Sequence, residues 1–385
     1  MSYVGNIKKT TKLKYHVSYL AVLVFLAAAI LLNSLGVLDR SATSLLSRIG
    51  INAILAVSLN LVVGFLGELS LGHAGFMCVG AYIGGMFANA LTKTVGDPVV
   101  ALVLGMLVGG LVAAVFGFVI GLPALRLKGD YLAIVTLAFG EIVRNLFKNL
   151  PWFGGAMGLK TKPISTSKLF IIAFVTLAVV VILIGNLIRS KHGRAITAVR
   201  DNEIAAKAMG INVTFYKLLV FVVAAFFAGV AGTLFSRFTT PVQYGDYSYN
   251  KSIEILVMVV FGGMGSINGS LVAAALITTL DVKLTEWLSG DLAAVKLLVY
   301  ALILIFVILF NNAPAFKPLK DSLTGVIKKI TGVFARKPHA PEKIKEDKAA
   351  WDRIETKIKM DELLSVEVVQ VNKEFTPDKP EKEEK

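Results

Sequence analysis

The stretch RSKHGRAITAVRDNEIAAKAMGINVTFYK, residues 189–217, separates two segments that are apolar enough to cross a lipid bilayer. Within it, Asp201 or Asn202 can cap a short helix over residues 203–209, and Gly210 can end that helix in a left-handed conformation. Such a helix carries one small apolar face, made of Ile204, Ala205, Ala208 and Met209. We therefore predict a polar docking loop between membrane spans.

Composition indicates that most of the chain lies in a bilayer. Hydrophobic residues make up 55% of the 385 residues, and the mean hydropathy is +0.71, which argues against a soluble enzyme. The net charge of +14 does not indicate nucleic-acid binding, because the basic residues fall mainly between apolar segments and in residues 312–385. This last segment holds 16 basic and 14 acidic residues, so the rest of the chain holds 24 basic and 12 acidic residues. That excess fits the positive-inside bias of membrane proteins.

Ten apolar runs are close to the length that a helix needs to cross a bilayer, about 20 residues. The runs cover residues 17–38, 49–66, 75–91, 99–122, 131–147, 169–188, 215–235, 252–265, 269–288 and 293–310. They predict an all-α, polytopic membrane helical bundle over residues 17–311 with about ten transmembrane helices. Because the run at 252–265 is short and contains glycines, a count of eight or nine is also open.

The distribution of basic residues orients these spans. We expect residues 1–16 to form a cytoplasmic amino-terminal segment, and the loop at 189–217 and residues 312–385 to be cytoplasmic as well. Four lysines before the run at 169–188 oppose this topology, because it places them outside. The rest of the charge distribution agrees with it.

Two glycine-rich clusters interrupt apolar sequence, GFLGELSLGHAGF at 64–76 and VFGGMGSINGS at 260–270. A broken helix at membrane depth persists only where it is buried in protein or lines a water-filled cavity. Glycine-broken segments in both halves of a chain favour a transport path, and a tight hairpin at the membrane edge is the alternative. The candidate path residues are Gly67, Glu68, Ser70, Gly72, His73, Gly262, Gly263 and Gly265.

Ionisable residues inside spans are costly and often functional. Glu141 and Arg144 are three apart and can pair on one helix face. Two further acidic residues either line a path or pair with a nearby lysine, Glu254 with Lys251 and Asp281 with Lys283.

The sequence offers no catalytic group of residues. Glu68 and His73 share a glycine-rich bend without a nucleophile or metal-ligand spacing. A G-x-x-x-x-G-K-[ST] phosphate loop is absent from the sequence. We therefore expect no catalytic residue, no metal and no cofactor bound by this chain, and energy supplied by a partner or an ion gradient.

Residues 312–385 form a charged tail. Apolar side chains at 344, 351, 354 and 358 predict an amphipathic helix within residues 343–360. The flanking segments KPHAPEK and PDKPEKEEK are typical of disorder.

Four motifs in order resemble the branched-chain amino acid ABC transporter permease family, over about residues 53–310. They are the cluster at 64–76, RLKGDYLAIVTLAFGEIVR at 126–144, the loop at 189–217, and VMVVFGGMGSINGS at 257–270. The chain is most similar to the longer of the family's two permease paralogues. It departs from the family after residue 310, where it reads NNAPAFKPLKD and continues for about seventy residues.

The resemblance implies a type II importer-like permease of the prokaryotic plasma membrane that forms a heterodimer with a second permease subunit. Two cytoplasmic ATPase subunits would use ATP, and an extracytoplasmic binding protein would deliver branched-chain or related amino acids. The loop at 189–217 is similar to the family's Glu-Ala-Ala loop, with Ile204 inserted after Glu203. The ATPase-coupling residues that this implies are Arg200, Asp201, Glu203, Ala205, Ala206, Met209 and Gly210.

Other functions are open at this point. Permeases of the same architecture for urea and short amides, sugars or nucleosides would share these motifs. An ion-coupled secondary carrier would work alone and would not need the helix at 203–210. A membrane-embedded enzyme is opposed by the lack of a clustered nucleophile, base or metal ligands.

Overall fold

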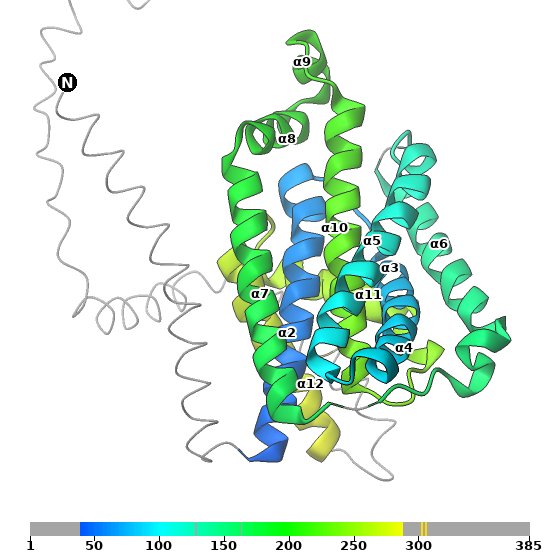
Figure 1. Ribbon diagram of the computed structural model, residues 1–385. Helices are drawn as coiled ribbons and strands as arrows, with labels where there is room; N and C mark the ends of the chain where they lie inside the picture. The colour runs from blue at the N-terminus through cyan, green and yellow to red at the C-terminus, as the bar shows by residue number, and fades with distance from the viewer. Residues whose placement is uncertain (1–38, 128, 163, 288–301, 303–304, 306–385) are drawn as a thin grey trace, which may run out of the picture. The chain divides into compact units, whose positions relative to one another are not determined.

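The computed structural model describes residues 39–127, 129–162, 164–287, 302 and 305, and Figure 1 shows these as helices joined by short turns. Within this part of the chain, β-structure is limited to one isolated bridge between Leu159 and Val242. The predictions for residues 1–16, 17–38 and 312–385, including the helix at 343–360, lie outside the described residues, as does nearly all of 293–310.

Six helical spans in the described part are long and apolar enough to cross a membrane. They are α2 with the π-helical turn η1 (Arg40–Asn60, Leu61–Leu66), α3 with η2 and α4 (His73–Val79, Gly80–Gly84, Gly85–Val95), α5 (Pro98–Ala124), α7 (Thr166–Arg189), α10 (Val213–Phe238) and α12 (Ile267–Trp287). The other helices are α6 (Asp130–Asn149), α8 (Lys191–Asp201), α9 (Glu203–Ala208) and α11 (Tyr249–Gly262), with 3-10 turns η3 (Pro151–Phe153), η4 (Gly155–Met157) and η5 (Tyr244–Tyr247).

Each of the eight apolar runs predicted between residues 49 and 288 corresponds to one of these helices or helical spans. Two of them are not among the six spans: α11 has only 14 residues, and α6 carries four charged residues. The prediction of an all-α membrane bundle is confirmed.

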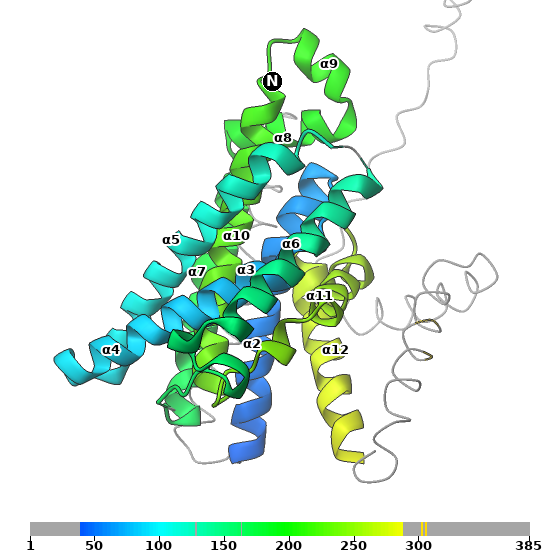
Figure 2. The ribbon, with the colours of Figure 1, turned by 90° about the vertical axis from the view of Figure 1, so that its right-hand side faces the viewer.

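Helix α2 lies in the middle of the bundle, between α7, α10 and α12 (Figures 1 and 2). Its second half is buried on every side, and Ile51, Ile54, Leu55 and Leu59 have no exposed surface. A helix that is hydrophobic all round is expected in the centre of a bundle. The segments that follow α2 are therefore held inside the protein.

Helix α5 packs along α10 through small residues. A Cβ atom at Gly229 would lie 2.5 Å from the Cβ of Ala113 and 2.7 Å from the carbonyl oxygen of Gly109. Small residues four apart let two backbones approach closely in a bilayer, where apolar surface alone gives little drive for association. The glycines of α5 therefore serve the packing of this helix against α10.

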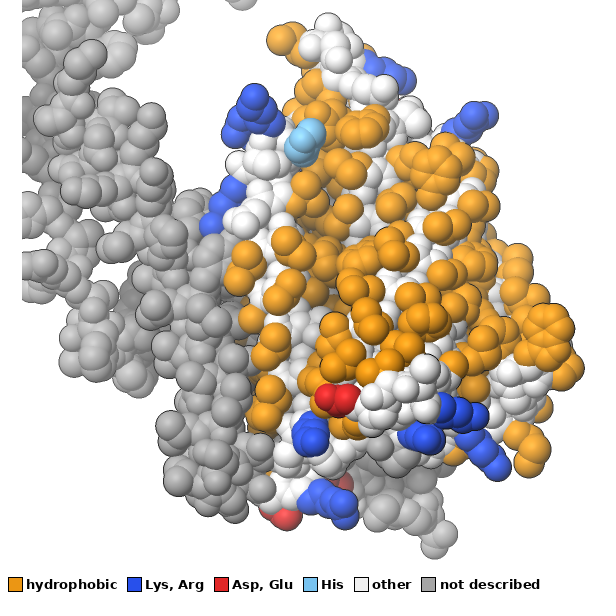
Figure 3. Space-filling view, in the orientation of Figure 1, with side chains coloured by type: hydrophobic (Ala, Val, Ile, Leu, Met, Phe, Trp, Pro, Cys, Tyr) orange, Lys and Arg blue, Asp and Glu red, His pale blue; other side chains and the backbone are white. Residues whose placement is uncertain are grey.

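The outer surface of the bundle is apolar between two polar ends. Figure 3 shows hydrophobic side chains over the middle of one face, and basic side chains towards both ends. On α5, Leu111, Val115 and Val119 are each about 60% exposed, as expected for a lipid-facing or partner-facing surface. We call the end that carries α8 and α9 the loop end. At the opposite end α2 begins and α10 finishes (Figure 1).

Candidate functional site

The polar loop folds into two short helices at the loop end. Ser190 caps α8 by accepting hydrogen bonds from two backbone N–H groups. Asn202 caps α9, since its Oδ1 accepts the N–H groups of Ile204 and Ala205 at 3.0 Å each. Gly210 follows α9 with a φ of +79°. The predicted short helix is confirmed, and Asn202 is the cap.

The predicted apolar face of α9 is accessible. Ile204 is 80% exposed and Met209 is 81% exposed, and Ala205 and Ala208 are exposed beside them. Ala206 differs from these residues, because it is only 4% exposed and packs into the protein core. Figure 1 shows α9 at the extreme end of the described bundle.

Lys217 joins this loop to the first glycine-rich cluster. It lies near the start of α10 and is 5% exposed. Its Nζ is 2.5 Å from Oε1 of Glu68 and 3.2 Å from Oε2 of Glu203, the first residue of α9. The two predicted sites thus share one buried cation. Sequence reasoning missed this contact, although a lone lysine inside an apolar run was a usable signal.

Arg200 makes a second connection between α8 and the cluster. Its Nη1 donates to the carbonyl oxygen of Gly64 at 3.2 Å, while its exposed head also pairs with Asp201 at 2.9 Å. A Cβ atom at Gly67 would lie 2.7 Å from Cγ of Arg200, so Gly67 allows the arginine stem to pack there. Gly67 has a φ of +81° and ends the turn η1.

The two glycine-rich clusters meet in space. A Cβ atom at Gly64 would overlap the backbone of Gly265. Asn60 secures this crossing: its Oδ1 accepts the N–H of Gly265 at 2.9 Å, and its Nδ2 donates to Ser266 O and Ser270 Oγ. The sequence signal for Asn60 was one of two amides inside the run at 49–66, and it went unused.

The turn between α11 and α12 is built from the other predicted glycines. Gly262 packs on Gly269, where a Cβ atom would lie 2.5 Å from the carbonyl group. Gly263 and Gly265 have φ values of +89° and +81°. All three predicted residues of this cluster therefore lie at one helix–turn–helix junction at the loop end.

The rest of the first cluster is seated against neighbouring helices. The N–H of Leu71 donates to Thr136 Oγ1 at 3.0 Å, and a Cβ atom at Gly72 would lie 2.5 Å from Thr136 O. Ser70 and His73 are both buried. The His73 Nε2 lies 2.8 Å from the hydroxyl of Ser58. His73 and Glu68 therefore have different partners and do not form a catalytic pair.

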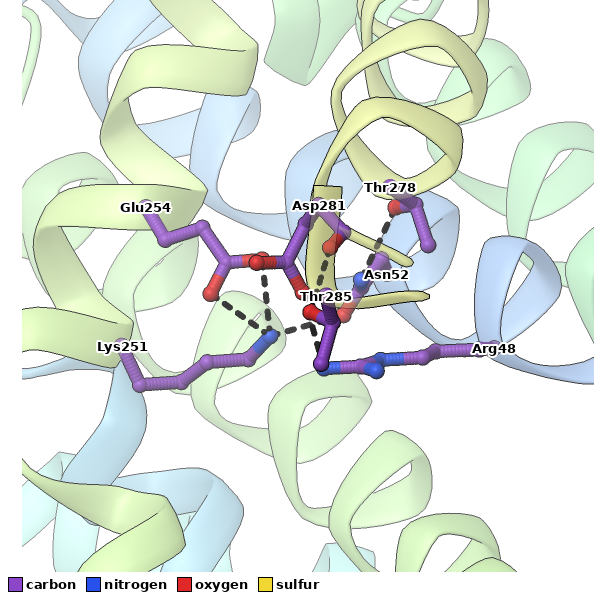
Figure 4. Close-up of polar contacts among 7 residues, drawn as sticks. All are labelled: Arg48, Asn52, Lys251, Glu254, Thr278, Asp281 and Thr285. Atoms are coloured by element: carbon purple, nitrogen blue, oxygen red, sulfur yellow. Dashed lines mark hydrogen bonds and ion pairs between the residues drawn. The ribbon is translucent and has the colours of Figure 1, made fainter. Parts of the chain in front are cut away.

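A second polar cluster lies towards the opposite end, where α2, α11 and α12 meet (Figure 4). Lys251 Nζ is 3.1 Å from Glu254 Oε2 and donates to Asn52 Oδ1 at 3.1 Å. The Nδ2 of Asn52 donates to Thr278 Oγ1 at 2.9 Å. Each charge in this cluster has a partner of opposite sign, as the cost of an isolated charge requires.

The predicted pair of Glu254 with Lys251 is therefore confirmed. For Asp281 the predicted partner, Lys283, is wrong. Arg48 Nη2 lies 3.2 Å from Asp281 Oδ2, whereas Lys283 pairs with Glu286 at 2.7 Å. The sequence prediction considered only the nearest lysine, and α2 brings Arg48 from 233 residues away. The predicted pair of Glu141 and Arg144 is confirmed at 2.6 Å.

Among the described residues, no three or more His, Cys, Asp or Glu side chains are placed to hold a metal ion.

Apolar helices of bilayer length, a short exposed helix on a polar loop, and two glycine-rich breaks that cross inside the bundle define a multi-pass membrane transport permease. The family described as branched-chain amino acid transport system / permease component matches residues 41–308, and the chain belongs to this family.

Known relatives agree with this membership. The high-affinity branched-chain amino acid transport system permease protein LivM of Salmonella typhimurium is 36% identical over 276 residues, which are 62% of this chain and 62% of LivM. The LivM of Escherichia coli is 35% identical over 67% of this chain and 65% of its own length. The permease protein LivH of Salmonella typhimurium is 23% identical over 62% of this chain and 83% of LivH. The chain thus spans less than two thirds of the two LivM proteins, and its identity to them is higher than its identity to LivH.

Proposed function

We propose that this chain is the membrane-spanning permease subunit of an ATP-driven ABC importer for branched-chain or related amino acids. Its similarity to proteins named as LivM supports the substrate class. Its weaker similarity to LivH supports a heterodimer with a second permease. Two ATPase subunits and an extracytoplasmic binding protein complete the proposed assembly, in which this chain holds no ATP itself.

The observation that carries the proposal is the exposed apolar face of α9. Ile204 and Met209 are about four-fifths exposed on the loop that joins α7 and α10. Exposed apolar side chains gathered on a small projecting element are typical of a partner surface. We propose that an ATPase subunit covers this face and that the loop end is cytoplasmic, with both chain termini on the same side.

The contacts beneath α9 suggest how a movement of the ATPase would reach the membrane. Glu203 on α9 and Glu68 in the first cluster share Lys217, and Arg200 on α8 holds Gly64. A push on α8 and α9 would therefore move the backbone at Gly64, and with it the crossing at Gly265. In this proposal Arg200, Asp201, Glu203, Ala205, Met209 and Gly210 present or position the docking helix, and Ala206 anchors it.

We place the cytoplasmic end of the transport path at this crossing of glycine-rich segments. Broken helices at this depth leave backbone groups that protein or water must satisfy. Of the candidate path residues, Gly67, Glu68 and Gly265 lie at the crossing, while Gly72 packs against Thr136 of α6 and His73 lies beside Ser58 of α2. Ser70 is buried in the same segment. An aliphatic amino acid needs few polar groups along such a path.

Leucine uptake tests the proposal in cells that express the chain with its second permease, both ATPases and the binding protein. We expect uptake that stops when ATP is depleted and persists when the proton gradient alone is dissipated. Uptake with the reverse dependence, or by this chain without the ATPases, would identify a secondary carrier instead.

The orientation has its own test. Cys78 is buried, so a Cys78→Ala background leaves Asn202→Cys as the single reactive site. We expect a membrane-impermeant thiol reagent to label Asn202→Cys in inside-out vesicles and not in intact cells. Labelling in intact cells would invert the topology.

A further inference from the structure

The described part of the bundle contains a cavity of about 370 Å³ at the end opposite the polar loop. Its lining residues lie where α2 and α7 begin and α10 finishes. Figure 1 shows these helix ends at the lower end of the bundle. A neighbouring cavity of about 290 Å³ shares Arg40, Ser165 and Thr166 with it. This region takes no part in the docking helix or in the crossing of glycine-rich segments.

Arg237, near the end of α10, forms part of the cavity wall. It is only 2% exposed, and its Nη1 donates to Asn89 Oδ1 at 2.9 Å and to Lys162 O at 2.6 Å. Its Nε and Nη2 have no acceptor within the part of the chain that the structure describes. Both acceptors of Nη1 are uncharged, so the described residues give this guanidinium no counter-charge.

A buried guanidinium in this state is costly. Buried donors without an acceptor lose the hydrogen bonds that they made in water, and a buried charge without a partner costs more. The fork of Nε and Nη2 matches the two oxygens of a carboxylate or phosphate. Arg237 therefore lines the cavity with a charge that the described residues leave uncompensated, and an oxyanion in the cavity would neutralise it.

The other walls have the same polarity. Arg40 adds a second guanidinium, and Ser44, Ser165 and Thr166 add hydroxyl groups. The described lining residues include no carboxylate. Asp39, the nearest acid in sequence, accepts instead from the backbone of Arg40 and the hydroxyl of Ser41. The first turns of α2 and α7 contribute the positive ends of two helix dipoles.

The cavity also has an apolar side, formed by Ile164, Leu169 and Phe238. A bare inorganic anion would leave this surface in contact with water. An oxyanion attached to an aliphatic group would bury it and gain the hydrophobic contribution as well. The lining therefore favours a ligand with one anionic head and a short hydrocarbon part.

We propose that this cavity is a binding site for an aliphatic oxyanion, held by Arg237 and Arg40 with its hydrocarbon part on Leu169 and Phe238. Two sources carry this chemistry: a small branched carboxylate in the aqueous phase, and the phosphate of an anionic lipid. The site stands on the cavity and on Arg237, and it does not depend on the transport function proposed above.

The thermal unfolding midpoint of the full chain in nanodiscs tests the site with defined probes. The first pair is 4-methylpentanoate and its uncharged amide, in phosphatidylcholine nanodiscs. The second pair is nanodiscs with and without phosphatidylglycerol. We expect the carboxylate, the anionic lipid or both to raise the midpoint, and the amide to leave it unchanged.

Variants assign the effect to the cavity. Arg40→Gln and Arg237→Met should each weaken binding roughly tenfold or more, as expected for the loss of a charged hydrogen bond. Lys168→Gln is the matched control, because Lys168 is exposed on the first turn of α7 and does not line the cavity. If Arg237→Met does not fold, the response of Arg40→Gln still shows whether the probes bind in the cavity.

The outcomes separate the sources. A response to the carboxylate alone assigns a soluble ligand, and a response to phosphatidylglycerol alone assigns a lipid headgroup. Equal responses to acid and amide, no response to any probe, or a full response retained in Arg40→Gln would overturn the proposal.

Discussion

Lys217 and Glu68 are 149 positions apart in the sequence, and their side chains form an ion pair of 2.5 Å at the foot of the polar loop. The lysine side chain is 6% exposed and the glutamate side chain is 14% exposed. The same ammonium group reaches Glu203 on α9. One cation thus holds both the docking helix and the glycine-rich segment. A movement of either one must therefore strain the ion pairs that hold the other.

Lys217→Met should destabilise the protein strongly. The change leaves the largely buried Glu68 without its cation, and breaking one side of a buried pair costs about 3–5 kcal/mol. Thermal unfolding of the purified chain measures this effect. Lys283→Met is the control, because Lys283 and Glu286 are about half exposed and such pairs contribute little. Equal unfolding midpoints for both variants would contradict the role given to Lys217.

The exposed face of α9 should matter for transport and not for folding. Ile204→Asp with Met209→Asp changes two side chains that are about four-fifths exposed, so stability should change by no more than about 0.5 kcal/mol for each. Leucine uptake should fall at least tenfold if an ATPase covers this face. Normal uptake by the double variant would remove α9 from the coupling mechanism.

Ala206→Asp should impair folding, in contrast to the changes on the exposed face of α9. Ala206 is buried, and a carboxylate placed there must be desolvated or force α9 away from the bundle. We expect a lower unfolding midpoint and less protein in the membrane. The comparison with Ile204→Asp separates anchoring of the helix from docking on its outer face.

This contrast marks how far the sequence could lead. The cap at Asn202, the end at Gly210 and the shared face of α9 follow from signals within ten residues, and all were predictable. The side of α9 that is exposed could not be predicted, because it depends on where α10 places Lys217. Helical periodicity defines a face without saying what lies opposite it.

The same distinction applies inside the membrane. Both glycine-rich clusters were visible in the sequence, since each breaks an apolar run. The contact between them at Gly64 and Gly265 was not visible in the sequence. It depends on Asn60, which bonds to Gly265 across 205 positions. Arg48, Lys217 and Arg237 were missed for the same reason. Each is a single charge in or beside a span, and the groups that it contacts come from distant parts of the sequence.

Gly72→Leu should prevent assembly of the bundle as well as transport. Even a Cβ atom at Gly72 would lie 2.5 Å from the backbone oxygen of Thr136, and backbone cannot rotate away as a side chain can. We expect little folded protein in detergent, measured by size-exclusion chromatography. Gly245→Ala is the control, because nothing lies within 4 Å of that position. A monodisperse Gly72→Leu protein would show that α6 can move away.

The cluster around Lys251 should behave as a coupled unit. Lys251→Met alone leaves Glu254 without its ammonium partner and should lower stability, and Glu254→Gln alone leaves the lysine unpaired. The double variant removes both charges and should recover part of the loss, because replacing a whole buried pair is often neutral. A double-mutant cycle on unfolding free energies measures the coupling. Additive effects would mean that the pair does not interact.

Asn60→Leu tests the crossing of the two glycine-rich clusters. Leucine has a similar size, so the change removes hydrogen bonds and leaves little cavity. The N–H of Gly265 loses its acceptor, and the hydroxyl oxygen of Ser270 loses a donor. Both losses occur at a site where Asn60 has no exposed surface. Each stranded group costs about 1–3 kcal/mol, so unfolding should occur at a clearly lower temperature.

Ser270→Ala gives the graded comparison for this crossing, because it removes one bond of Asn60 and leaves the bond to Gly265 intact. Its effect should be nearer about 1 kcal/mol. Asn145→Ala is the control, since Asn145 is exposed and bonds only within α6. If the crossing closes the cytoplasmic end of the path, Asn60→Leu should also let leucine leak without ATP in proteoliposomes, and Asn145→Ala should not. A destabilised but tight Asn60→Leu protein would keep Asn60 as a structural residue and move the closing point of the path elsewhere.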